Sequence, residues 1–310
     1  MEIVPQHPLL HFTQEDVKAA REMYDQDAKR LNEGIDAIKE WMEKQAHLAE
    51  SSKYITRDFI ERIILLAKGS IEVAKKKIDR LFTVRAMLPD MCLHRKLGEF
   101  DDFLKGVTLV YLPKLFPEER SRVTVTKILT DNIDNLNLID YCRYGNMIGE
   151  YRGNHDYNIG ERFIVDLSNV SIISKMNPVV IKNYDSLGEI YNFKVKGVHV
   201  VNGPQYVDTL VNLFKSVTRD KVASRIHVHK SYEDLHKYIP KEILPVDFGG
   251  DEPPLATLAE KWKELIKTPE FQEWNEMQDK LVSDESKRSS TNHNEEYLGM
   301  PGSFRKLNVD

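Results

Sequence analysis

Residues 194–230, KVKGVHVVNGPQYVDTLVNLFKSVTRDKVASRIHVHK, contain a strand pattern, an amphipathic helix pattern, a basic cluster and a second strand pattern, in that order. We expect the helix from about Pro204 to Val217, because apolar residues recur there at helical spacing on one face. The basic residues on either side of it are Lys194, Lys196, Lys215, Arg219, Lys221 and Arg225. An apolar helix face flanked by cations predicts contact with both apolar matter and an anionic surface.

The composition of the whole chain excludes several protein classes. Among its 310 residues, 44 Lys and Arg face 49 Asp and Glu, and the net charge of −5 provides no global field for nucleic acid. Cys92 and Cys142 are too few for a disulfide framework or a cysteine-rich zinc site. The first residues lack a secretory signal pattern, and no apolar run approaches the ~18 residues of a membrane span. We therefore expect a soluble, monomeric protein of the reducing cytosol without a nucleic-acid partner.

Residues from about 13 to 95 are charged, poor in glycine and helical in their apolar period. Helix starts are indicated at Thr13, Thr56 and Ser70, each a hydroxyl residue before a periodic run. This predicts a small helical bundle.

Residues from about 105 to 250 alternate between strand and helix patterns instead. The strand patterns cover residues 122–128, 162–166, 196–201 and 225–229. Several are apolar at successive positions, as in buried parallel strands, and their connections can hold helices such as one over 178–191. The sequence predicts an α/β fold, with an N-terminal helical bundle followed by a mostly parallel sheet flanked by helices. We expect domains at 1–95 and 96–252, a C-terminal helix over 253–283 and a flexible tail over 284–310.

With these elements in place, the chain resembles the CRAL-TRIO lipid-binding family, which includes retinaldehyde-binding, tocopherol-transfer and clavesin members. The resemblance covers about residues 30–250. Its motifs are KVKGVHVVN at 194–202, the helix after Pro204, RIHVH at 225–229 and ILPVDFGG at 243–250. The C-terminal run GSFRKL at 302–307 is similar to the tails of insect members.

The resemblance implies an apolar pocket between a sheet floor and helices, closed by a mobile lid helix at residues 204–217. We expect the pocket to hold one lipophilic molecule, such as a retinoid, tocopherol or carotenoid. The candidate lining residues are Phe163, Val165, Tyr184, Leu187, Val198, Val207, Leu210, Leu213 and Phe214. The alternative for each is an ordinary place in the core, since apolar side chains are buried in any fold.

The resemblance also implies a basic cleft that binds phosphoinositide head groups of a membrane. The matching positions here are Lys194, Lys196, Lys221 and Arg225. The alternative is a solvated charged face, which most charge clusters are. The chain departs from the family motif at Leu65 and Ala67, where members usually have arginines, and only Lys68 is still basic there, so the resemblance does not extend to head-group binding by the helical domain.

The sequence offers no positive case for catalysis, a cofactor or a metal. It has no nucleophile elbow, no P-loop and no Gly-rich dinucleotide turn. His227 and His229 would share one face of a strand, but no third ligand is apparent nearby, and structural histidines are expected. We expect a non-enzymatic carrier of a hydrophobic molecule with reversible, phosphoinositide-dependent membrane docking. A clavesin-like membrane-trafficking adaptor is the alternative.

Overall fold

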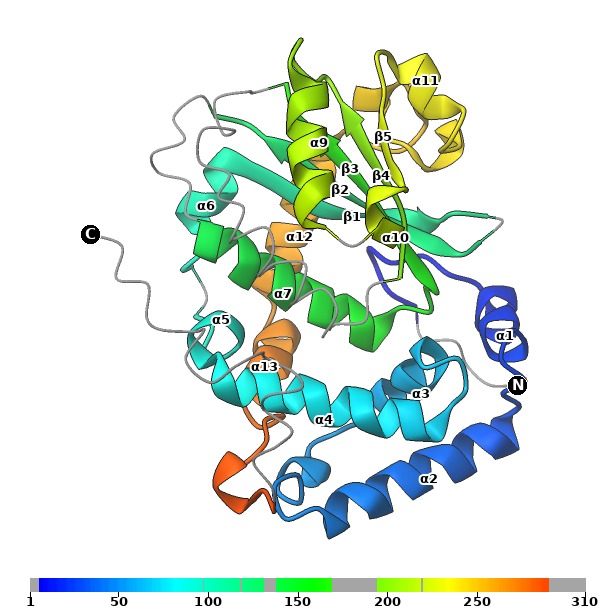
Figure 1. The fold of residues 1–310 in the computed structure, drawn as a ribbon, viewed down its shortest axis with the longest axis vertical. Helices are drawn as coiled ribbons and strands as arrows, with labels where there is room; N and C mark the ends of the chain where they lie inside the picture. Colours follow the sequence, from blue (N-terminus) through cyan, green and yellow to red (C-terminus); the bar gives the residue numbers. More distant parts are fainter. Residues whose placement is uncertain are drawn as a thin grey trace.

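The structure, a computed structural model, describes residues 6–96, 98–117, 119–130, 138–168, 194–218 and 220–289. Helices of the N-terminal region lie below a β-sheet, and further helices cover both faces of that sheet (Figure 1). The predicted fold class is therefore confirmed. Within the described segments, no helix is both long and apolar enough to cross a membrane.

The N-terminal helices begin where the sequence predicts. Thr13 forms a capping box with Asp16, and the Thr56 and Ser70 hydroxyls accept hydrogen bonds from the first turns of the helices that follow them. The helices are α1 (Gln14–Glu22), α2 (Ala28–Lys44), the 3₁₀ turn η1 (Ser51–Lys53), α3 (Arg57–Leu66), α4 (Ile71–Met87) and α5 (Pro89–Cys92). Apolar faces of α2, α3 and α4 form one buried cluster, which makes this region a bundle with its own core.

Five strands of the described chain form one sheet in the order β1-β2-β3-β4-β5. They are β1 (Val107–Leu115), β2 (Ser121–Ile128), β3 (Gly160–Asp166), β4 (Val195–Val201) and β5 (Ile226–Val228). β2 to β5 are parallel, as predicted, whereas β1 pairs antiparallel with β2. β1 was not predicted from the sequence. It follows helix α6 (Asp101–Gly106) and contains Pro113, which this edge strand tolerates at the register irregularity between Tyr111 and Leu115.

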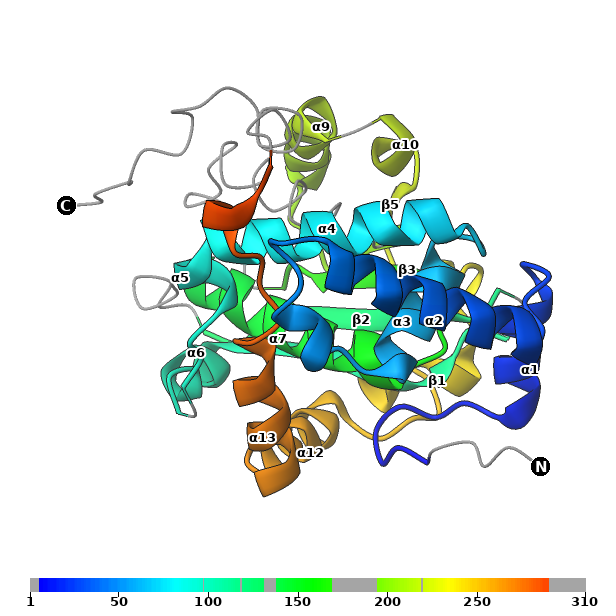
Figure 2. The same cartoon turned by 90° about the horizontal axis from the view of Figure 1, so that it is seen from below.

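Two helices cover one face of the sheet. α7 (Leu138–His155) lies over β1–β3, where the Tyr141 and Thr126 hydroxyls are 3.3 Å apart. α9 (Val207–Val217) packs on β4 and β5. On the other side of the sheet lie α12 (Leu255–Ile266) and α13 (Pro269–Gln278), as Figure 2 shows. The expected helix at residues 178–191 lies outside the described residues.

Short elements complete the described chain. They are α10 (Asp220–Ala223), α11 (Tyr232–His236), and the 3₁₀ turns η4 (Lys241–Ile243), η5 (Val246–Phe248) and η6 (Glu285–Lys287).

The C-terminal region differs from the single helix expected over 253–283. It forms two helices, α12 and α13, because Thr268 and Pro269 start a new helix. The chain then returns to the bundle, where Arg288 forms an ion pair with Asp79 of α4 at 2.8 Å. The packed chain thus extends to residue 289, beyond the expected start of the tail, and the rest of that tail lies outside the described residues.

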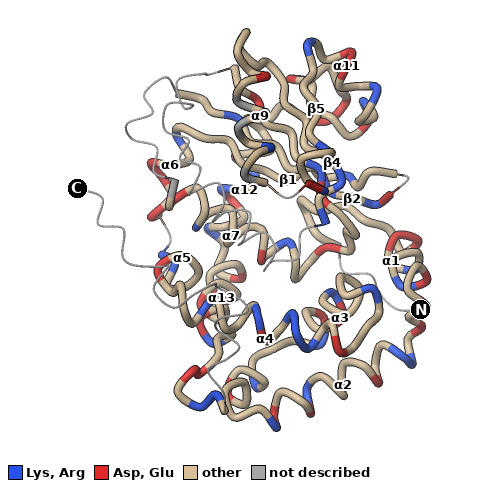
Figure 3. The backbone as a smooth tube through the Cα atoms, viewed as in Figure 1, with Lys and Arg blue, Asp and Glu red and all other residues tan. Residues whose placement is uncertain are grey.

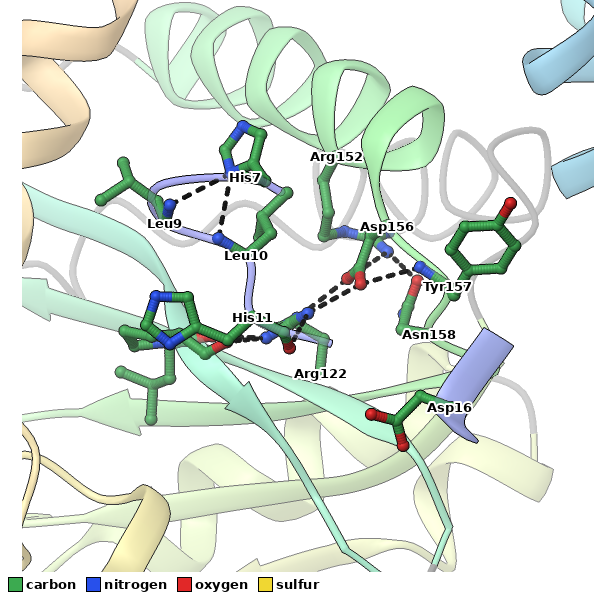
Figure 4. Close-up of polar contacts among 12 residues, drawn as sticks. His7, Leu9, Leu10, His11, Asp16, Arg122, Arg152, Asp156, Tyr157 and Asn158 are labelled. Atoms are coloured by element: carbon green, nitrogen blue, oxygen red, sulfur yellow. Dashed lines mark hydrogen bonds and ion pairs between the residues drawn. The ribbon is translucent and has the colours of Figure 1, made fainter. Parts of the chain in front are cut away.

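A fully buried ion pair ties three segments together (Figure 4). Arg122 of β2 binds both carboxylate oxygens of Asp156, with Nε to Oδ2 at 2.8 Å and Nη2 to Oδ1 at 2.7 Å. The same guanidinium donates to the His11 carbonyl at 3.3 Å and the Leu112 carbonyl at 3.1 Å. The Arg122 side chain therefore contacts the N-terminal segment, β1 and the residue that follows α7.

Candidate functional site

Three predicted lining residues lie on the sheet face that α9 covers. Phe163 of β3 pairs with Val198 of β4, and Val165 pairs with Val200 two residues further on. Because side chains alternate between the faces of a strand, all four point to the same side. Phe163, Val165 and Val198 remain half-buried, so this apolar face is only partly covered by described residues.

Helix α9 seats its apolar stripe directly on this face. Val207 and Val211 form a buried cluster with Val200 and Ile226, and Val198 and Phe214 pack against it. The structure therefore joins Val198, Val207 and Phe214 of the predicted set, with Phe163 and Val165 on the adjoining strand. Leu210 and Leu213 lie on α9, but the structure does not describe their side chains. Tyr184 and Leu187 lie outside the described residues.

The predicted basic positions gather at one edge of the sheet. Lys194 and Lys196 stand at the start of β4, and Arg225 stands at the start of the neighbouring parallel strand β5. The Arg225 guanidinium donates to the Val195 carbonyl, which holds the strand starts together. Lys221 is exposed on α10, just before Arg225. Figure 3 shows Lys and Arg positions, in blue, around the β4 label. We call Lys194, Lys196, Lys221 and Arg225 the basic edge.

Lys194 is a half-buried member of the basic edge. Its Nζ donates to the Tyr24 hydroxyl at 2.9 Å and lies 4.9 Å from the centre of the Tyr24 ring. Burial, and then the charges of Lys68 and Lys196, lower the pKa of Lys194 to about 8. Burial and the nearby Lys194 and Arg80 also lower the pKa of Lys77 to about 8. The bundle thus places Lys68 and Lys77 near the basic edge despite the apolar Leu65 and Ala67.

An acidic residue at this edge, Glu119, was not predicted from the sequence. Glu119 precedes β2, and its Oε1 accepts a hydrogen bond from Arg162 Nε at 2.5 Å. Its Oε2 lies 3.6 Å from Lys196 Nζ. Burial raises the pKa of Glu119, but the Arg162 hydrogen bond and charge outweigh burial and lower it overall. No local motif marks Glu119, because the contact depends on the pairing of β2, β3 and β4.

The structure also corrects the view that His227 and His229 have no histidine neighbour. His199 of β4 pairs with His227 across the parallel ladder, and its Nδ1 lies 2.9 Å from His229 Nε2. Arg162 Nη1 lies 3.2 Å from His199 Nε2, and because arginine can only donate, this nitrogen is unprotonated. The rings stack with centroids 5.1 to 6.4 Å apart. Among the described residues, no group of three or more His, Cys, Asp or Glu could hold a metal.

The buried imidazole of His199 predicts acid sensitivity. Burial, followed by the charge of His229, lowers the pKa of His199 from 6.5 to about 3. Since the unfolded chain binds the proton first, stability is fully present above pH ~6.5 and decreases as the pH falls towards 3. At pH ~5 this one residue is expected to cost about 2 kcal/mol.

Denaturant unfolding at pH ~7.5 and ~5.0, which lie above and below the ordinary His pKa, measures this loss in the free energy of unfolding. The variant His199→Asn should lose about 2 kcal/mol less between the two conditions than the parent protein. His11→Asn is the control, because the His11 side chain is exposed. An equal pH dependence in the parent and His199→Asn would refute the assignment.

Part of the chain is similar to known proteins. Residues 120–250 match the CRAL/TRIO domain family. Clavesin-1 of Rattus norvegicus is 33% identical over 117 residues, covering 36% of this chain and 32% of that protein. Clavesin-2 of Homo sapiens is 33% identical over 95 residues, covering 29% of each. The chain thus matches less than a third of the length of either relative.

The crystal structure of Sfh5 superposes with a TM-score of 0.49 at 14% identity, covering 80% of this chain and 99% of Sfh5. The family match spans strands β2 to β5, helix α9 and the ILPVDFGG run. Over residues 120–250 the chain is therefore similar to CRAL/TRIO domains.

Proposed function

We propose that this protein is a non-enzymatic carrier that binds one hydrophobic small molecule and docks reversibly on phosphoinositide-containing membranes. The observation that carries the proposal is that strands β4 and β5 bear both features. Their faces hold the apolar contact with α9, and their starting ends hold the basic edge. The carrier would act as a monomer in the cytosol, without a cofactor or a nucleic-acid partner.

The apolar face suits a lipophilic ligand such as a retinoid, tocopherol or carotenoid. A lipid gains about 0.8 kcal/mol for each CH₂ group that leaves water, so tight binding needs no charged contact. The half-buried side chains of Phe163, Val165 and Val198 offer such a surface beside α9. Specificity would then come from shape and a few polar contacts.

Membrane docking would allow the bound ligand to leave or enter the protein. Each basic residue near an anionic surface contributes about 1 kcal/mol, which suits reversible binding. Helix α9 ends beside α10, which carries Lys221, and Tyr206 at its start is 50% exposed. A bilayer at the basic edge would offer the α9 apolar stripe an alternative to Val200 and Ile226. The packed and opened positions of α9 would then be two states that the membrane shifts.

Ligand capacity is tested by extracting the purified protein with organic solvent and identifying the extract by mass spectrometry. We expect a lipophilic molecule in near-stoichiometric amount. In Val165→Asp its yield should fall more than tenfold, because burying an unpaired carboxylate costs more than the ~1.4 kcal/mol that tenfold represents. Val246→Asp is the control, since Val246 is 52% exposed on η5. Absence of any ligand, together with no uptake of retinoid, tocopherol, carotenoid or phospholipid, would contradict the carrier proposal.

The second candidate is a phosphoinositide-binding adaptor of membrane trafficking, favoured by the similarity to Clavesin-1 and Clavesin-2. In this role the apolar face would be incidental. The Val165→Asp variant separates the two functions. An adaptor would keep its vesicle binding and its protein partners when ligand uptake is lost, whereas a carrier would lose its cargo transfer between vesicles.

A further inference from the structure

We propose that the Glu119 carboxylate is an internal anion that occupies the basic edge and competes there with the phosphate groups of a phosphoinositide head group. The inference rests on the proposed docking function and adds the residue that limits its affinity. Glu119 lies in the β1–β2 connection, far in sequence from all four residues of the basic edge.

The Glu119 carboxylate bridges two cations of unequal exposure. Arg162 holds Oε1 at 2.5 Å and Ser121 Oγ donates to the same oxygen at 2.9 Å, whereas Lys196 lies 3.6 Å from Oε2. The Arg162 side chain is 15% exposed and the Lys196 side chain is 33% exposed. Lys196 is therefore the partner that can turn towards an external anion.

The position of Arg162 is fixed on its other side. Its Nη1 bonds to the unprotonated Nε2 of the buried His199, and its guanidinium lies 4.7 Å from the centre of the Phe116 ring. With Arg162 held in this way, Glu119 stays at the edge when Lys196 leaves it. An incoming phosphate then meets a lysine whose charge is already partly neutralised, and a fixed negative charge close by.

Removing this charge should strengthen phosphate binding. In Glu119→Gln the amide oxygen can still accept from Ser121 or Arg162, so the fold is retained, but the charge on Lys196 becomes available. A partly exposed ion pair of this kind corresponds to about fivefold in affinity. We therefore expect Glu119→Gln to bind soluble inositol trisphosphate, and phosphatidylcholine vesicles containing phosphatidylinositol bisphosphate, about fivefold more tightly than the parent protein.

Titration calorimetry measures the soluble head group, and vesicle sedimentation measures the membrane. Glu40→Gln is the matched control, because it removes the same charge from an exposed position on α2. Thermal unfolding followed by circular dichroism checks that both variants are folded. A gain in Glu119→Gln but not in Glu40→Gln supports the inference, whereas equal affinities in Glu119→Gln and the parent, or equal gains in both variants, overturn it.

Comparing the parent protein with Glu119→Gln in these two binding measurements also separates this inference from the docking proposal. If the parent protein binds neither probe and Glu119→Gln binds both, the internal anion is supported and docking by the parent is not. If the parent binds and Glu119→Gln gains nothing, docking stands and the internal anion falls. If neither protein binds either probe, both proposals are wrong.

Discussion

Replacing Lys194, Lys196, Lys221 and Arg225 together with Ala is expected to abolish phosphoinositide-dependent vesicle binding. Four cations at about 1 kcal/mol each amount to about 4 kcal/mol, which is roughly a thousandfold in affinity. Ligand uptake should survive, because the apolar contact of α9 with Val200 and Ile226 includes none of these side chains. Vesicle sedimentation and solvent extraction measure the two properties on the same sample.

A control variant for the basic edge must remove four positive charges from another part of the surface. Lys18, Lys29, Lys44 and Lys53 suit this purpose, because their side chains are 74%, 84%, 69% and 64% exposed on the N-terminal helices. Changing all four to Ala should leave vesicle binding nearly intact. If the basic-edge variant still binds, or if the control loses binding equally, then docking does not use this edge.

Phosphate binding at the basic edge should depend on pH, because two half-buried lysines have lowered pKa values. Burial and neighbouring cations lower the pKa of both Lys194 and Lys77 to about 8. A phosphate group stabilises the protonated lysine, so binding is coupled to proton uptake near that pH. Affinity for inositol trisphosphate should accordingly be highest below pH ~8 and decrease as the pH rises through it. If the affinity for inositol trisphosphate does not change as the pH rises through ~8, Lys194 does not belong to the phosphate site.

The β4–α9–β5 region could be predicted because its signals are local. The strand runs, the apolar stripe of the helix and the basic residues all lie within residues 194–230. The parallel pairing of β4 with β5 then brings Lys194, Lys196 and Arg225 to one edge without further information. The resemblance supplied the expected family and the hypothesis that α9 is a lid.

Contacts between distant segments could not be predicted in the same way. Lys77 approaches Lys194 only because the helical bundle docks beside the start of β4. Glu119 reaches Lys196 only through the adjacent strands β2, β3 and β4. The His199 neighbour of His229 was accessible in principle, since parallel pairing of the VHVV and IHVH runs aligns their histidines. That inference required a strand order that periodicity alone does not give.

The buried Arg122–Asp156 pair carries the second large prediction. Replacing Arg122 with Met should lower the free energy of unfolding by about 3–5 kcal/mol, because it leaves a buried carboxylate without its main partner. Burial raises the pKa of Asp156, but the charge and hydrogen bonds of Arg122, aided by Arg152, outweigh burial and lower it. Asp156 is therefore ionised in the parent protein, and in the variant its carboxylate keeps the hydrogen bond from the Tyr157 amide and the Arg152 guanidinium at 4.0 Å. Denaturant unfolding measures the change.

Two further variants separate the lost pair from lost packing. Arg57→Met breaks an exposed Arg–Asp pair, whose side chains are 46% and 65% exposed, and should cost at most about 1 kcal/mol. Adding Asp156→Asn to Arg122→Met should recover part of the loss, because the uncompensated charge is gone while Asn can still accept from the Tyr157 amide. If the double variant is no more stable than Arg122→Met, the cost lies in the contacts of Arg122 with the His11, Leu112 and Pro113 carbonyls. The guanidinium would then act as a backbone clamp between the N-terminal segment and β1, and its charge partner would be secondary.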